Sequence, residues 1–204
     1  ASFGTIIHTA LQVISDHYKD HKELPGKEIW METVKHAASK EILTSKEREK
    51  FIQDAEQSIE AYLYASNCPM ERFAISEKRF PKSRPVVIEW VALTGSIDRV
   101  EYLDDQEVQV VDFKTGKYKA PTSDYGQDYE RQLYFYKLLW DGSGQDRVLT
   151  HGILDYVTDL KNHDVRRTVT TFDEEKLALL RRQIKAFGES LKNLDFPAEP
   201  FEIT

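Results

Sequence analysis

Cysteine is almost absent from this sequence, which contains only Cys68. A single thiol cannot form an internal disulfide, and alone it cannot build a zinc or iron–sulfur site. Beside Pro69 it is expected to be a small apolar filler. The sequence also lacks an apolar run of the roughly 20 residues that a membrane helix needs, and it has no Gly-x-x-x-x-Gly-Lys-Thr phosphate loop. We therefore expect neither a membrane span nor a nucleotide-driven motor within it.

An excess of positive charge is also lacking. The sequence has 28 Lys and Arg against 35 Asp and Glu, which gives a net charge of −7. Proteins that bind nucleic acids are usually basic, so this balance argues against such a partner. The objection is weaker if some carboxylates bind metal ions, whose charge cancels theirs. Local basic clusters can also contact phosphates on an otherwise acidic surface.

The rest of the composition is typical of a folded protein. The 204 residues are 40% hydrophobic and 31% charged, which suits one domain with a core and a helical appendage. The chain begins Ala-Ser-Phe-Gly-Thr and continues directly into an amphipathic pattern, so no signal peptide is expected. Without an initiator Met it is expected to be a piece of a longer protein. The lone cysteine suits a reducing compartment, and the expected location is cytoplasmic, associated with the nucleoid.

Apolar spacing, capping residues and turn residues predict the secondary structure. Helices are expected at residues 3–18, 28–40, 44–65, 128–140 and about 177–194, and strands at 72–80, 86–93, 95–103, 107–114, 148–157 and 165–172. Residues 115–127 are expected to form a polar loop, and the two prolines after Phe196 predict an extended tail. The short turn at 104–106 predicts that 95–103 and 107–114 pair as an antiparallel hairpin.

These elements predict an α/β fold with a small mixed central sheet. Helices 3–18 and 128–140 would flank the sheet, and residues 28–65 would form an additional helical lobe between the first helix and the sheet. The last helix would pack outside. The whole of residues 1–204 is then expected to be one domain.

Three charged residues on the predicted hairpin are the main candidates for chemistry. Side chains alternate along a strand, so Asp112 and Lys114 share a face while Phe113 points the other way. Asp98 lies on the neighbouring strand, within expected reach of the same ion. Two carboxylates held together repel each other, and a divalent cation removes that repulsion. An ordinary ion pair at a strand end is the alternative for an isolated Asp-x-Lys.

Oxygen ligands with open coordination positions suit Mg²⁺ or Mn²⁺. Such an ion polarises a phosphodiester and lowers the pKa of bound water, and a neighbouring lysine stabilises the charge that develops in the transition state. The pattern therefore predicts metal-assisted hydrolysis of a phosphodiester.

Five segments resemble the motifs of the PD-(D/E)XK nuclease superfamily, in that family's order. They are Phe3-Gly4-Thr5-Ile6-Ile7-His8, Ser76-Glu77-Lys78-Arg79-Phe80, Gly-Ser-Ile-Asp-Arg at 95–99, Val-Val-Asp-Phe-Lys-Thr-Gly at 110–116 and Gln132-Leu133-Tyr134-Phe135-Tyr136. Within the superfamily the chain resembles the RecB-like branch, found at the C-terminus of helicase–nucleases such as RecB and AddA and in related exonucleases. The resemblance implies a restriction-endonuclease-like core.

The resemblance also implies roles for individual residues. His8, Asp98, Asp112 and the backbone carbonyl of Phe113 match metal ligands, and Lys114 matches the catalytic lysine. Gln132 and Tyr136 match a Gln-x-x-x-Tyr helix, one turn apart, which would contact the DNA backbone or support the site; core packing with a polar tip is the alternative. The role of Glu77 stays open between orienting the site and helping to hold a second ion.

The chain departs from some relatives in two respects. Four cysteines bind an iron–sulfur cluster in those relatives, and this chain cannot form one, although Phe196-Pro197-Ala198 resembles the segment before those cysteines. It also contains no helicase motif, so a motor is expected elsewhere in a longer chain or in a partner. Basic residues that could follow DNA phosphates, if they are not simply solvated turns, are Arg79, Lys82, Arg84, Lys117 and Lys119.

The expected function is Mg²⁺- or Mn²⁺-dependent DNA hydrolysis, with exonuclease or end-processing action on single strands in repair or recombination. Two alternatives stay open. One is a catalytically silent module of the same fold that binds DNA or a helicase partner. The other is a metal-dependent hydrolase of a different phosphoester, which would need a closed small-molecule pocket.

Overall fold

The first three helices begin where the sequence places strong helix signals. In the computed structural model, which describes residues 3–195, they are α1 (Phe3–His21), α2 (Lys27–Ser39) and α3 (Ser45–Leu63). The predicted stripe of α1, including Ile7, Leu11 and Ile14, is fully buried. Thr44 caps α3 through the predicted capping box, since its side chain accepts the Glu47 N–H and the Glu47 carboxylate accepts the Thr44 N–H. These helices were therefore predictable from local sequence.

The central sheet has five strands in the order β1–β4–β5–β6–β7. They are β1 (Ala74–Phe80), β4 (Gly95–Tyr102), β5 (Glu107–Lys114), β6 (Val148–Lys161) and β7 (Asp164–Thr171). Strands β5 and β6 are parallel, and the other neighbours are antiparallel. The predicted hairpin of β4 and β5 and the predicted α/β class with a mixed sheet are confirmed.

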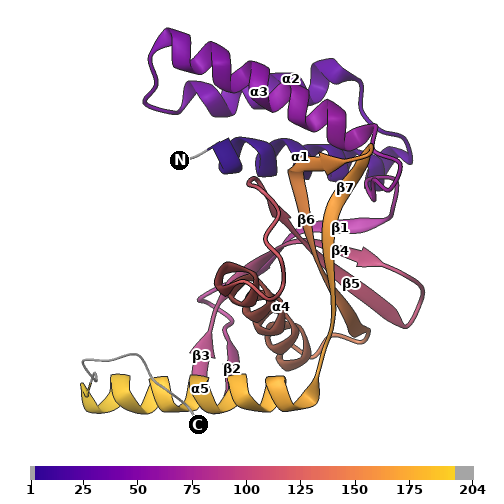
Figure 1. The fold of residues 1–204 in the computed structure, drawn as a ribbon. Helices are drawn as coiled ribbons and strands as arrows, with labels where there is room; N and C mark the ends of the chain where they lie inside the picture. The colour runs from indigo at the N-terminus through magenta and orange to yellow at the C-terminus, as the bar shows by residue number, and fades with distance from the viewer. Residues whose placement is uncertain (1–2, 196–204) are drawn as a thin grey trace.

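Each face of the sheet has its own apolar core. Helices α1–α3 cover one face, where Val111 and Phe113 of β5 pack against their buried side chains. Helix α4 (Asp124–Gly142) packs on the other face with Val110 of β5, and the first half of α5 (Glu174–Asn193) packs there too. Figure 1 shows α1–α3 together at one end of the molecule and α5 at the opposite end, with the sheet between them. The two residues Phe113 and Val110 illustrate how alternation along β5 supplies both cores.

Several predicted bounds differ from the structure. Helix α1 continues three residues past 18, and α5 begins three residues before 177. Helix α4 starts four residues before 128, because the Ser123 hydroxyl accepts the Gly126 N–H and caps a turn that we had assigned to the loop. The predicted strand 86–93 is a separate hairpin of β2 (Val86–Ile88) and β3 (Val91–Leu93), because Glu89 and Trp90 both have positive φ and form a tight turn. Strand β6 runs on past 157, through an irregularity in its pairing with β7 between Tyr156 and Leu160.

The apolar stripe of α5 is buried only in its first half. Leu177, Leu180 and Ile184 lie in the core, whereas Phe187 is 50% exposed and Leu191 is 45% exposed. The extended tail predicted for 196–204 lies outside the described residues. Within the described part of the chain, no helix is both long enough and apolar enough to cross a membrane.

Cys68 behaves as the sequence suggested. It is partly buried and packs against the core beneath α1–α3. Burial raises the pKa of its thiol to about 11, so the thiol stays protonated near neutral pH. It is a packing residue rather than a reactive one.

A buried polar contact fastens the helical lobe to the sheet. The Tyr62 hydroxyl on α3 donates to Asp155 Oδ2 on β6 at 2.9 Å, and Arg167 on β7 donates to both oxygens of the same carboxylate. Burial is the main reason that the pKa of Asp155 is raised, and the Tyr62 and Arg167 bonds oppose that rise.

We therefore expect Tyr62→Phe to lower the free energy of unfolding by about 1.5–3 kcal/mol, the usual value of a hydrogen bond to a charged group. Urea unfolding would measure the change. The matched control is Tyr64→Phe, because Tyr64 is 85% exposed on the same helix end, and its change should stay within about 0.5 kcal/mol. Equal effects of the two substitutions would contradict this role for Tyr62.

Candidate functional site

The two candidate carboxylates lie where strands β4 and β5 separate. The pairing of the two strands runs from Tyr102 and Val108 to Arg99 and Val111, and one position further it would place Asp98 opposite Asp112. At that position the Asp98 side chain takes the place of the backbone hydrogen bonds between the two strands, because Asp98 Oδ2 accepts the Phe113 N–H at 3.0 Å. The end of the hairpin therefore brings Asp98 and Asp112 together, as the sequence pattern predicted.

Asp98 is held in a setting that disfavours its negative charge. The pKa of Asp98 is raised to about 6, mainly by burial and next by the negative charge of Asp112. His8, the Phe113 N–H and Lys114 lower this pKa, but by less. His8 reaches it from α1, with Nδ1 at 3.4 Å from Asp98 Oδ2. The His8 ring also stands edge-on to Phe113, with centroids 6.0 Å apart. The pair of carboxylates has more negative charge than its protein surroundings balance.

A closed ring of contacts joins the remaining candidates. Lys114 Nζ donates to Gln132 Oε1 at 2.8 Å, and Gln132 Nε2 donates to the Tyr136 hydroxyl at 2.7 Å. That hydroxyl donates to Asp112 Oδ1 at 2.8 Å. Lys114 Nζ closes the ring 2.5 Å from Asp112 Oδ2. Gln132 and Tyr136 thus fix the lysine and the carboxylate relative to each other.

The direction of this ring follows from the chemistry of its members. Burial and the charge of Asp112 raise the pKa of the Tyr136 hydroxyl, so it stays protonated and can only donate to Asp112. Its lone pairs then accept from the Gln132 amide, which leaves the amide oxygen for the Lys114 ammonium.

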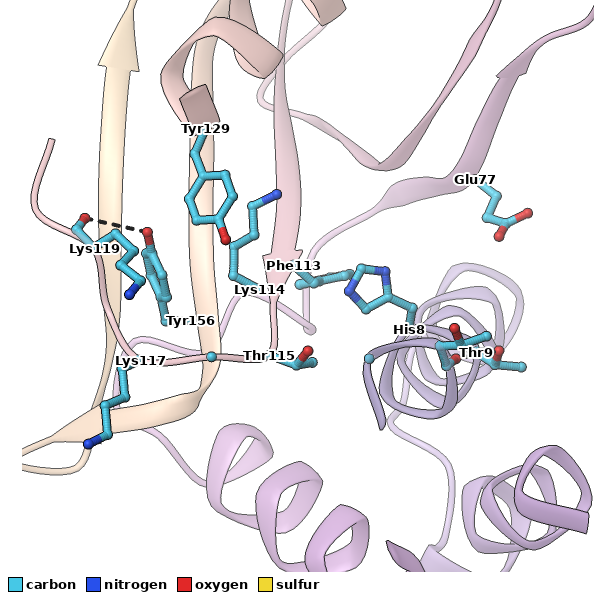
Figure 2. A pocket seen from close by; sticks show the side chains of 13 residues that line it. His8, Thr9, Glu77, Phe113, Lys114, Thr115, Lys117, Lys119, Tyr129 and Tyr156 are labelled. Carbon is cyan, nitrogen blue, oxygen red and sulfur yellow. Dashed lines mark hydrogen bonds between the residues drawn. The ribbon is translucent and has the colours of Figure 1, made fainter. Parts of the chain in front are cut away.

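Lys114, His8 and Phe113 border an open cleft of about 510 Å³, whereas Asp98, Asp112, Gln132 and Tyr136 lie behind them and do not line it. In Figure 2 His8 and Phe113 stand beside Lys114, while Tyr129, Tyr156, Lys117 and Lys119 line the other side. Gly4, Thr5 and Thr9 of α1, Glu77 of β1 and the loop after β5 complete its lining. A cleft that is open to solvent can take one strand of a polymer, unlike a closed pocket shaped around a small molecule.

The donors present suit a hard divalent cation. Asp112 Oδ2 is buried and accepts no hydrogen bond of good geometry, although the Lys114 ammonium is close. An unsatisfied buried carboxylate oxygen is costly and favours a cation. Among the side chains that the structure describes, those of residues 3–123 and 126–195, no three His, Cys, Asp or Glu are grouped to hold an ion by themselves. Mg²⁺ nevertheless commonly binds through one or two carboxylates with waters, which is the set that Asp98 and Asp112 offer.

Glu77 lies in the same cleft but is engaged elsewhere. It lines the cleft with His8 and a separate, smaller hollow with His8 and Asp98, while its carboxylate pairs with Arg79. Its φ is +45°, and it occupies the position opposite Asp98 where the pairing of β1 with β4 is interrupted. A non-glycine residue in this backbone region is strained, and such strain concentrates at functional sites. Both of its predicted roles stay open.

The five predicted DNA-contacting basic residues fall in different places. Lys117 and Lys119 line the cleft beside Lys114. Arg79 and Arg84 border a second cavity of about 700 Å³ at the end of β1, together with Lys78. Lys82 is exposed on the turn between them. Only Lys117 and Lys119 are therefore placed beside the candidate catalytic residues.

Sequence reasoning overlooked Tyr129. It lies on α4 three residues before Gln132, and its ring centroid is 4.3 Å from Lys114 Nζ. Helical spacing could have revealed it, because residues three apart share a face of a helix. The charged side chains of Arg99 and Glu101, which are fully buried, were also overlooked.

Comparisons with known proteins agree with the family that the motifs suggested. The family model described as PD-(D/E)XK nuclease superfamily matches residues 1–202. No curated protein matches the chain. A solved structure described as "Crystal structure of SSO0001" is similar at a TM-score of 0.38 and 14% identity, over 90% of this chain and 74% of that one. The mixed α/β architecture is consistent with a restriction-endonuclease-like fold.

Proposed function

The chain belongs to the PD-(D/E)XK nuclease superfamily, and from that premise we propose that it is a deoxyribonuclease that needs Mg²⁺ or Mn²⁺. The observation that carries the proposal is the junction of β4 and β5, where Asp98 meets the ring formed by Asp112, Lys114, Gln132 and Tyr136. An ion pair without function would not need a second carboxylate and a buried network beside it. The alternative of an ordinary strand-end ion pair is therefore disfavoured.

Each residue has a role in this proposal. The carboxylates of Asp98 and Asp112 would hold the ion together with the Phe113 carbonyl, and His8 would join them once its contact with Asp98 opens. A bound ion supplies polarisation of the phosphodiester and a water of lowered pKa. Lys114 orients the attacking water and stabilises the extra negative charge on the phosphate in the transition state. Gln132 and Tyr136 hold the side chains of Lys114 and Asp112 at fixed positions relative to each other.

DNA is proposed as the substrate because the site is open and bordered by ammonium groups. Lys117 and Lys119 would follow the phosphates next to the site, with Arg79, Lys82 and Arg84 contacting them further along. We further propose the RecB-like branch, end-processing of single strands in repair or recombination, and a helicase motor in a longer chain or a partner. The order of the five sequence motifs supports these finer assignments. We also propose that residues 1–204 form one nuclease domain that includes the lobe 28–65.

The first prediction from this proposal concerns the metal ion. The purified protein should cut labelled DNA in Mg²⁺ or Mn²⁺ and should stop when EDTA is added, because neither carboxylate can act on the phosphate without the cation. Single-stranded and blunt duplex oligonucleotides should be compared on denaturing gels, and excess Mg²⁺ should restore cleavage after EDTA.

Cleavage that persists in EDTA would contradict the mechanism. Failure to cut any DNA in either metal, with DNA still bound, would support the catalytically silent module instead. Faster hydrolysis of a small phosphoester than of DNA would support the third function considered, a hydrolase of another phosphoester. The assay therefore separates all three functions.

A further inference from the structure

We propose that Tyr129 is a positioning residue for Lys114, a role that rests on the nuclease function proposed above. Tyr129 lies outside the five segments that resemble the family's motifs, yet its ring centroid lies 4.3 Å from the Lys114 ammonium. That separation is within the range in which the face of an aromatic ring attracts a cation. In Figure 2 the Tyr129 ring stands directly beside the Lys114 side chain, on the wall of the cleft away from His8.

Lys114 benefits from such a contact because its side chain is long and its two polar partners, Asp112 and Gln132, both engage its N–H groups. Asp112 Oδ2 and Gln132 Oε1 both draw the ammonium back toward β5 and α4. A lysine held only by a carboxylate would be neutralised at short range and turned away from a phosphate in the cleft. The Tyr129 ring holds the charge without offering a lone pair of comparable strength, so it does not compete with a phosphate oxygen for the N–H groups.

The ring, rather than the hydroxyl, carries this role. Among the described side chains, which exclude residues 124 and 125, no hydrogen bond of the Tyr129 hydroxyl is found, and the Tyr129 side chain is partly buried at the rim of the cleft. The residue is also not part of either apolar cluster's fully buried set, although it packs against the one beneath α4. A partly buried aromatic residue whose ring faces an ammonium group is therefore better explained by its contact with Lys114 than by packing alone.

The kinetic test compares Tyr129→Leu with Tyr129→Phe. Leucine removes the ring face, and kcat for DNA cleavage should fall about threefold to thirtyfold with little change in KM, which is the range expected for one cation–ring contact. Phenylalanine keeps the ring face and should restore most of the wild-type kcat. Tyr64→Leu is the matched control, since Tyr64 is 85% exposed at the end of α3. A rise in KM alone would overturn the proposal in favour of a substrate contact, and equal losses in the two Tyr129 variants would overturn it in favour of the hydroxyl.

A second measurement does not depend on cleavage. In protein carrying ¹³C-labelled lysine, the ε-methylene signal of Lys114 should be shifted upfield by the ring current of Tyr129. Its assignment follows from its loss in Lys114→Arg. The shift should persist in Tyr129→Phe and disappear in Tyr129→Leu. An unshifted signal in the wild type would overturn the proposal even if the protein is an active nuclease. A shifted signal in a protein that cuts no DNA would mean that the nuclease function is wrong and that the contact between Tyr129 and Lys114 is right.

Discussion

Replacement of Lys114 by alanine should lower the rate of DNA cleavage by about a hundredfold to a thousandfold, the usual loss when one group that stabilises transition-state charge is removed. The substitution removes the ammonium that contacts both Asp112 and Gln132. Because the interaction is with charge that develops during the reaction, the loss should appear in kcat, with KM for DNA changing by less than about threefold. Single-turnover cleavage of a labelled oligonucleotide would measure it directly.

Two controls make this result specific to the site. Lys161→Ala removes an exposed lysine at the end of β6 and should leave cleavage unchanged. Thermal unfolding should show that the Lys114 variant is folded at the assay temperature, since Asp112 is then left buried without its neighbouring ammonium. A folded Lys114→Ala protein that cuts DNA at the wild-type rate would refute the catalytic role.

The geometry at Asp98 and Asp112 was predictable because it depends on local rules. Alternation along β5 fixes the shared face of Asp112 and Lys114, and the short turn at 104–106 fixes which residues of β4 lie opposite. Helical spacing likewise fixes the relation of Gln132 and Tyr136. What these rules could not give is the rotation of α4 against the sheet, which decides that the Tyr136 hydroxyl reaches Asp112. That rotation depends on side-chain packing across the whole interface.

Elements that lacked a local signal were mistaken or overlooked. The turn at Glu89 and Trp90 contains no glycine or asparagine, so the hairpin of β2 and β3 has no usual turn signal. Arg99 and Glu101 sit two apart on β4 and would ordinarily be assigned to a solvated face, yet both are fully buried. Their burial depends on groups from α1 and the segment before β1, which no pattern within β4 can reveal.

The surroundings of Arg99 supply nearly every hydrogen bond that its guanidinium needs. Nε donates to Glu101 Oε1 at 2.9 Å, and Nη2 donates to the carbonyls of Pro69 and Arg72 at 3.1 and 3.0 Å. Nη1 contacts the Ser15 hydroxyl of α1. The buried Glu101 has its other oxygen bonded to Gln109 Nε2 at 2.6 Å. A single arginine therefore joins α1, the segment that leads into β1, and the strand that carries Asp98.

Arg99→Met should consequently lower the free energy of unfolding by about 3–5 kcal/mol, the cost of breaking a buried ion pair. The cation that remains near Glu101 is Arg72, which is 55% exposed and has its Nη1 3.5 Å from Glu101 Oε2. Methionine fills a similar volume, so the loss comes from Glu101 and the freed carbonyls rather than from a cavity. The loss is a large part of the roughly 5–15 kcal/mol by which such a domain is stable. Urea unfolding followed by far-UV circular dichroism would measure it.

A double variant separates the unpaired charge from the loss of the arginine contacts. In Arg99→Met/Glu101→Gln the buried negative charge is gone, and the amide oxygen of the new glutamine can still accept from Gln109. This protein should recover a large part of the lost stability, because neutralising Glu101 removes a desolvation penalty that the longer contact with the half-exposed Arg72 does not offset. Lys176→Met breaks the ion pair between Lys176 and Glu130, which is largely exposed on the lysine side, and should cost less than about 1 kcal/mol. If the double variant is no more stable than Arg99→Met, the carbonyls of Pro69 and Arg72 and the Ser15 contact, not the ion pair, account for the stability that Arg99 provides.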